Sequence, residues 1–175
     1  WLDALLGTFE RFPDTGIAGA QLLYPDGRLQ EAGGVVFADG GAWNYGRFES
    51  PEDPRYASLR EVDYCSGAAI MVSTALFRDL GGFDARYAPA YYEDTDLAFA
   101  VRARGLRVLY QPAARVVHLE GITAGTDTGS GIKAYQIRNR GLFARKWAEA
   151  LIGQPAAGTL PSPSTLAHGQ RQVLV

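Results

Sequence analysis

The sequence predicts an α/β fold with a mixed sheet, because helical stripes, strand-like runs and turn signals alternate along its 175 residues. Residues 1–12 carry an apolar stripe at helical spacing, made of Leu2, Leu5, Leu6 and Phe9. Residues 17–24 form an apolar run typical of a buried strand, and Pro-Asp-Gly at 25–27 marks the turn after it. A hydrophobic content of 47% is enough for one domain with a real core.

Composition and charge exclude several classes of protein. A net charge of −2 gives no sign of nucleic-acid binding. The single cysteine, Cys65, excludes an internal disulfide framework and fits a reducing compartment. No apolar run approaches the ~20 residues that a membrane-spanning helix needs. Because the first residue is Trp1 and the only methionine is Met71, we expect a piece of a longer protein.

The middle of the chain predicts two strands and a long connection between them. Residues 34–37 predict a short strand, and residues 38–60 are rich in glycine, proline and charge. We expect the latter to form a surface excursion around Trp43, of a length associated with binding or mobility. Residues 62–73 are the strongest strand prediction, and their small central residues leave room for close approach to the backbone. A short helix over 74–80 follows and ends at a glycine pair.

An acidic helix is the clearest element of the second half. Residues 93–104 contain neither glycine nor proline, and Leu97 and Val101 lie four apart on one face. Acidic residues occupy the first turn and arginines occupy the last turn. Gly105 follows, and a glycine at this position is typical of a helix end. Stabilisation of the helix dipole accounts for these acids without any catalytic role, and for Asp96 this interpretation is the favoured one.

The remaining residues predict two strands, a helix and a tail. The strands cover 106–110 and 115–118, and a glycine- and threonine-rich loop over 121–131 has the composition of a lid. A basic helix is expected over 133–147. Beyond residue 151, proline, glycine, serine and glutamine dominate, so we expect a poorly ordered tail.

The start of the acidic helix also predicts chemistry. Glu93 and Asp94 follow an aromatic pair, Tyr91 and Tyr92, and His118 ends a later strand. A carboxylate fixed at a helix start suits removal of a proton from a hydroxyl, and a strand-end imidazole suits a metal ligand. Ordinary packing of the aromatic rings, and backbone hydrogen bonds to the histidine, remain open alternatives.

Four blocks of sequence, taken in order, resemble the C-terminal half of a family 2 glycosyltransferase of the GT-A type, in particular its rhamnosyltransferase-like members. They are residues 63–68 (DYCSGA), residues 80–84 (LGGFD), residues 93–97 (EDTDL) and His118. The resemblance covers residues 1 to 147. It implies a mixed-sheet GT-A fold, that of nucleotide-diphospho-sugar transferases, of which this chain is the acceptor-side portion over residues 1–149. Residues 150–175 would then be a flexible tail or linker.

The resemblance also assigns roles to individual residues. It makes Asp94 the general base of an inverting transfer and His118 a ligand of a divalent cation, Mg²⁺ or Mn²⁺. Other residues are expected to contact the acceptor: Glu93, Tyr91, Tyr92, Trp43 and Gly67. The family also uses an upstream Asp-x-Asp motif for the metal and the donor diphosphate. No such motif fits here, so we expect it to precede Trp1 and the isolated chain to be inactive.

The implied reaction moves a sugar from a nucleotide-sugar donor to a glycan or lipid-linked acceptor, in bacterial polysaccharide or cell-envelope biosynthesis. The implied location is the cytoplasm, with peripheral association at the inner face of the membrane. A non-catalytic glycan-binding or scaffold module on the same fold is the main alternative. A metal-dependent hydrolase that uses Glu93, Asp94, Asp96 and His118 ranks lower, because neighbouring carboxylates on one helix turn point in divergent directions.

Overall fold

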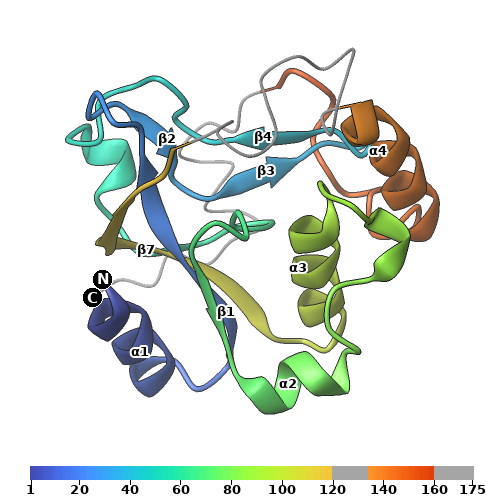
Figure 1. Ribbon diagram of the computed structural model, residues 1–175, viewed down its shortest axis with the longest axis horizontal. Helices are drawn as coiled ribbons and strands as arrows, with labels where there is room; N and C mark the ends of the chain where they lie inside the picture. Colours follow the sequence, from blue (N-terminus) through green and yellow to red (C-terminus); the bar gives the residue numbers. More distant parts are fainter. Residues whose placement is uncertain (120–133, 160–175) are drawn as a thin grey trace.

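The protein is described by a computed structural model over residues 1–119 and 134–159, which contains a curled mixed sheet and four α-helices (Figure 1). The helices are α1 (Leu2–Arg11), α2 (Thr74–Asp79), α3 (Glu93–Ala103) and α4 (Ala134–Lys146). All four fall where the sequence predicts helix, within one or two residues at each end. Two short 3-10 helices, η1 (Pro54–Tyr56) and η2 (Ala85–Tyr87), complete the helical elements.

Two long strands form the centre of the sheet. These are β1 (Thr15–Leu23) and β7 (Arg107–Val117), which pair in parallel. Around them the sheet takes the order β2-β1-β7-β5, with β2 (Leu29–Glu31) and β5 (Arg60–Glu61) antiparallel to their neighbours. The strand β6 (Ile70–Val72) pairs with the first half of β1. A separate two-stranded sheet joins β3 (Gly34–Val36) to β4 (Ala42–Asn44).

The core has two parts, on opposite faces of β1. Ala18, Ala20 and Leu22 alternate along the strand and pack with Leu5 of α1 in a small cluster. Ile17 belongs to the larger cluster, which includes the apolar face of α3, the ring of Phe143 in α4 and most of the buried tyrosines. In Figure 1, α1 and α3 accordingly lie on either side of the long strands. The first turn of α3 is therefore held on a packed scaffold.

The prediction of one strand over 62–73 is wrong. The chain makes a turn there, in which the Ala69 amide donates to the carbonyl of Ser66, and only Ile70–Val72 pairs as β6. The backbone amides of Ser66 and Gly67 donate to carboxylates rather than to a neighbouring strand. Since these amides are used by side chains, the sheet ladder cannot continue through them.

Two further predictions need correction. Residues 106–110 and 115–118 are not separate strands, because β7 runs through both with a register shift opposite Ala20 and Gln21. The irregularity accommodates Pro112, which has no amide hydrogen to donate. Residues 38–60 are also more than a surface excursion, because they contain β4 and η1 and bury the rings of Tyr45 and Tyr56.

The chain after α4 keeps contact with the rest of the domain as far as Pro155. Leu151 is buried, the Ala38 amide donates to the carbonyl of Pro155, and the Gln154 side chain donates to Asp63. The expected lid over 121–131, Lys133 and, of the tail expected over 150–175, residues 160–175 lie outside the described residues. No helix in the described ranges combines the length and the hydropathy that crossing a bilayer requires.

Candidate active site

The site is centred on Asp94, in the first turn of α3. One carboxylate oxygen, Oδ2, accepts a hydrogen bond of 2.9 Å from the Gly67 amide. The other, Oδ1, accepts one of 2.7 Å from the Thr95 amide. The residue is half-buried, so its carboxylate is oriented by two amides while part of it still faces solvent. A carboxylate held in this way can accept a proton from a bound hydroxyl.

The backbone before α3 is held in an unusual conformation. Tyr91 and Tyr92 have φ values of 71° and 74°, in the left-handed region that non-glycine residues rarely adopt. The buried side chain of Asn139, in α4, donates through Nδ2 to three carbonyls of this segment. They belong to Tyr87, Ala90 and Tyr91, at 2.7, 2.9 and 3.0 Å. The amide of Asn139 thus compensates for local strain that would otherwise move the start of α3.

Replacement of Asn139 with alanine is expected to lower the free energy of unfolding by about 2 kcal/mol, because one buried and two partly buried carbonyls lose the hydrogen bonds that Nδ2 donates. Urea denaturation followed by circular dichroism measures this change. The control is Ile137→Ala on the same helix, whose side chain is 72% exposed and should leave stability unchanged. Equal effects of the two substitutions would contradict the role of the Asn139 amide.

Glu93 differs from Asp94 although the two are adjacent. Burial raises the pKa of Glu93, and the negative charge of Asp94 raises it further. Its Oε2 atom is buried and has no hydrogen-bond partner among the described residues. The two carboxylates therefore have different environments, which suits different roles in one site.

Asp96 is a structural residue. Its Oδ2 accepts from Lys146 at 2.7 Å, and its Oδ1 accepts from the Trp147 indole at 2.7 Å and the Tyr87 hydroxyl at 3.0 Å. Only 4% of the residue is exposed. Asp96 thus joins α3 to the end of α4, and all its hydrogen bonds are internal. A hydrolase site that uses this carboxylate as a metal ligand does not fit these contacts.

One acidic residue of the site was not predicted from the sequence. Glu31, the last residue of β2, is fully buried, and its Oε1 accepts a hydrogen bond of 2.8 Å from the Ser66 amide. Burial raises the pKa of Glu31 to about 8, the Ser66 amide opposes this shift, and the charge of Asp94 adds to it. Its strand has three residues, too few to show an alternating pattern. The one feature of the sequence that could have indicated Glu31 is the position of an acidic residue between the turn at 25–27 and the apolar residues 35–37.

The predicted aromatic contacts divide into two kinds. Tyr92 is buried, its hydroxyl donates to the Gly40 carbonyl at 2.9 Å, and its ring packs on Phe143. This ring is a core side chain, so we do not assign it to the acceptor. Tyr91 is half-buried, and Trp43 on β4 is 41% exposed. These two rings have surface that a sugar could contact.

His118 follows β7 directly. Its amide donates to the Leu23 carbonyl, and its Nδ1 lies 2.8 Å from Oε1 of the buried Gln30. An amide oxygen at this distance favours the tautomer with hydrogen on Nδ1, which leaves the Nε2 lone pair for a ligand. In the described part of the chain, no group of three or more His, Cys, Asp and Glu residues could hold a metal ion. A metal bound at Nε2 of His118 would therefore need further ligands from outside the described residues.

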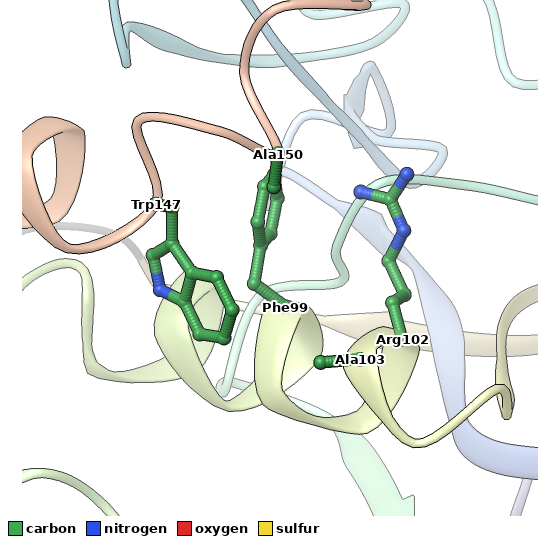
Figure 2. Close-up of a pocket in the computed structure, with 5 residues that line it drawn as sticks. All are labelled: Phe99, Arg102, Ala103, Trp147 and Ala150. Carbon is green, nitrogen blue, oxygen red and sulfur yellow. The ribbon is translucent and has the colours of Figure 1, made fainter.

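A separate hollow of about 260 Å³ lies near the C-terminal half of α3. Figure 2 shows the side chains that line it, which belong to Phe99, Arg102, Ala103, Trp147 and Ala150. The rings of Phe99 and Trp147 pack together with centroids 5.6 Å apart. Arg102 pairs with Asp63 at 3.0 Å. Because no carboxylate or imidazole lines this hollow, it lacks the groups that general base catalysis needs.

Parts of two known proteins are similar to this chain in sequence. No protein-family model matches the chain. The O-antigen biosynthesis protein RfbC of Myxococcus xanthus is 31% identical over 133 residues, which is 73% of this chain and 10% of that protein. An N-acetylglucosaminyl-diphospho-decaprenol L-rhamnosyltransferase of Mycobacterium tuberculosis is 30% identical over 145 residues, 77% of this chain and 47% of that protein. The chain thus spans less than half the length of these curated relatives.

A solved structure shares the fold. The crystal structure of GalNAc-T7 with UDP, GalNAc and Mn²⁺ matches 86% of this chain and 30% of its own, with a TM-score of 0.57 and 14% sequence identity. This similarity confirms the predicted GT-A-like arrangement of a mixed sheet and its helices.

Proposed function

We propose that this chain, a GT-A-like glycosyltransferase by fold and sequence similarity, forms the acceptor side of an inverting sugar-transfer site with Asp94 as the general base. The observation that carries the proposal is the half-exposed Asp94 carboxylate, held by the amides of Gly67 and Thr95. Two fixed hydrogen bonds define the direction from which an acceptor hydroxyl can approach.

The reaction needs one proton acceptor and one leaving group. The acceptor oxygen forms a bond to the anomeric carbon of the donor while the bond from that carbon to the diphosphate oxygen breaks. Asp94 takes the hydroxyl proton, and the nucleoside diphosphate leaves from the opposite face of the sugar. Inversion follows from this in-line geometry, and no covalent intermediate with the enzyme is required.

A divalent cation, when bound, would neutralise the charge that develops on the departing diphosphate. His118 is the residue of this chain that would hold it, through Nε2, while Gln30 orients the ring through Nδ1. The remaining ligands would come from a part of the protein outside the described residues. An Asp-x-Asp motif is the donor set that we propose for them.

The donor is proposed to be a nucleotide sugar, and the acceptor a glycan or lipid-linked glycan of cell-envelope polysaccharide synthesis. The names of the relatives support this class, since one is an O-antigen biosynthesis protein and one a rhamnosyltransferase. A lipid-linked acceptor would be met at the cytoplasmic face of the membrane. Trp43 and Tyr91 are the aromatic side chains that we place against the acceptor.

The test is release of nucleoside diphosphate by the full-length protein, supplied with Mg²⁺ or Mn²⁺ and a panel of sugar nucleotides. Release that depends on added glycan or lipid-linked acceptor supports transfer and identifies the donor. Absence of release from every donor, with a folded protein, would favour the second candidate. That candidate is a glycan-binding module, which the exposed ring of Trp43 also suits.

Replacement of Trp43 with alanine is expected to raise the acceptor KM about fivefold and to leave kcat unchanged. Trp43 is 41% exposed, and we expect its ring to contribute equally to acceptor binding in the ground and transition states. Steady-state kinetics with varied acceptor measure the effect, and Trp43→Phe, which keeps an aromatic face, serves as the control. A fall in kcat with unchanged KM would contradict a platform role.

A further inference from the structure

Two buried or half-buried carboxylates approach the same turn of the backbone from different elements. The Ser66 amide donates to Glu31 of β2, and the next amide, that of Gly67, donates to Asp94 of α3. Both bonds are well formed, at 2.8 and 2.9 Å. Consecutive peptide groups thus connect the proposed base to a carboxyl group that is itself fully buried.

We propose that Glu31 is a positioning residue, which holds the Asp94 carboxylate in place by anchoring the backbone of Ser66 and Gly67. The inference rests on the proposed function, because it gives Glu31 its role through the general base. Glu31 does not contact the reacting atoms.

The segment that leads into this turn is closely fitted on both sides. A Cβ atom on Gly34 would meet the Tyr64 ring at 1.9 Å, and one on Gly19 would meet the Cys65 side chain at 2.2 Å. The Tyr64 carbonyl also accepts from the Gly34 amide at 2.8 Å. These contacts fix the backbone as far as Cys65. The next residue along the chain is Ser66, and the hydrogen bond from its amide to Glu31 orients the start of the turn.

Burial of Glu31 carries a high desolvation cost. Its Oε2 atom is inaccessible to solvent and has no hydrogen-bond partner in the described ranges. An apolar residue of similar size would avoid this desolvation cost. A buried acid with an incomplete set of partners, close to a site carboxylate, indicates a functional role rather than a stabilising one.

The groups that face Glu31 also affect its protonation. Asp94 on α3 raises the pKa of Glu31 after the larger effect of burial, while the Ser66 amide lowers it. Tyr64 and Cys65 face the same carboxyl, and the pKa of each is raised by burial first and by the Glu31 charge second. With a pKa of about 8, Glu31 is mostly neutral at pH 7.

The sign of the pH effect follows from this shift. The pKa of Glu31 in the folded protein, about 8, is above its ordinary value of 4.5. The stability that the neutral acid contributes is therefore complete below pH 4.5 and is lost as the pH rises through 8. Glutamine at this position is neutral at every pH, so the corresponding loss should be absent.

The experiment compares Glu31→Gln and Glu31→Leu in the full-length protein. Glutamine keeps an oxygen for the Ser66 amide, whereas leucine keeps the volume but accepts no hydrogen bond. We expect Glu31→Leu to lower kcat about tenfold with both KM values within about twofold, and Glu31→Gln to retain kcat within about twofold. Between about pH 6 and pH 9, the melting temperature of the wild type should fall relative to Glu31→Gln.

A second readout does not depend on activity. Amide hydrogen exchange, measured by mass spectrometry on peptides that contain Ser66 and Gly67, should be about tenfold faster in Glu31→Leu and unchanged in Glu31→Gln. Unchanged exchange in the leucine variant, or equal losses of kcat in both variants, would overturn the proposal. If the wild type transfers no sugar, the proposed function fails, yet the exchange still decides whether Glu31 anchors the turn. If the leucine variant does not fold, the pH dependence of Glu31→Gln against wild type decides.

Discussion

Replacement of Asp94 with asparagine is expected to lower kcat for sugar transfer by about a thousandfold in the full-length protein, with the donor KM within about threefold of wild type. Asparagine has nearly the same shape and keeps one oxygen that can accept from the Gly67 amide. It cannot take the proton of the acceptor hydroxyl. The loss therefore belongs to the chemical step and not to donor binding.

Acceptor-dependent release of nucleoside diphosphate, measured at saturating donor, gives both kinetic parameters. Glu93→Gln is the matched control, because Glu93 directly precedes Asp94 on the same helix turn and the charge of Asp94 acts on it. We expect its effect on kcat to stay within about tenfold. Wild-type turnover by Asp94→Asn, or a larger loss in Glu93→Gln than in Asp94→Asn, would show that the base is another residue.

Replacement of Asp96 with alanine is expected to lower the free energy of unfolding by about 3 kcal/mol. Its carboxylate accepts from Lys146, Trp147 and Tyr87, so its loss leaves three donors of the α3–α4 junction without their acceptor. Lys146 keeps a second contact, to Asp84 at 3.0 Å, and is partly solvated, which places the estimate at the lower end for a broken buried ion pair.

Chemical denaturation of wild type and variant measures this difference. The control is Asp79→Ala, which removes an ion pair with Arg104 of 3.2 Å whose side chains are 70% and 52% exposed. An exposed pair of this kind should contribute about 0.5 kcal/mol or less. Similar losses in the two variants would show that Asp96 does not hold the two helices together.

Asp94 and Asp96 are two residues apart on α3, yet their carboxylates have different surroundings. Asp94 keeps one side towards solvent and accepts from backbone amides, whereas Asp96 points into the junction with α4 and accepts from side chains. Two residues along a helix rotate the side chain by about 200°. The sequence favours a structural role for Asp96, as stabilisation of the helix dipole. The structure shows that Asp96 also links α3 to the end of α4.

The sequence by itself determined the helices, the long strand β1 and the turn after it. These elements depend on local signals, such as the apolar stripe of α1, the acids at the start of α3 and Gly105 after its end. The ordered blocks around Gly67, Asp94 and His118 were enough to predict the GT-A-like fold. The signals for each helix, strand and turn lie within a window of about ten to twenty residues, and no distant partner is needed to read them.

Only the tertiary structure decided which residues meet at the site. The three-residue strand β2 brings Glu31 to the Ser66 amide, and Asn139 reaches the left-handed segment before α3 from a helix about fifty residues away. Burial and hydrogen-bond partners of this kind are set by long-range packing. A three-residue strand has no periodic pattern, and Asn139 is one of several polar residues in its helix. The proposed base could therefore be named from sequence, while the residues that hold it became visible only once the chain was folded.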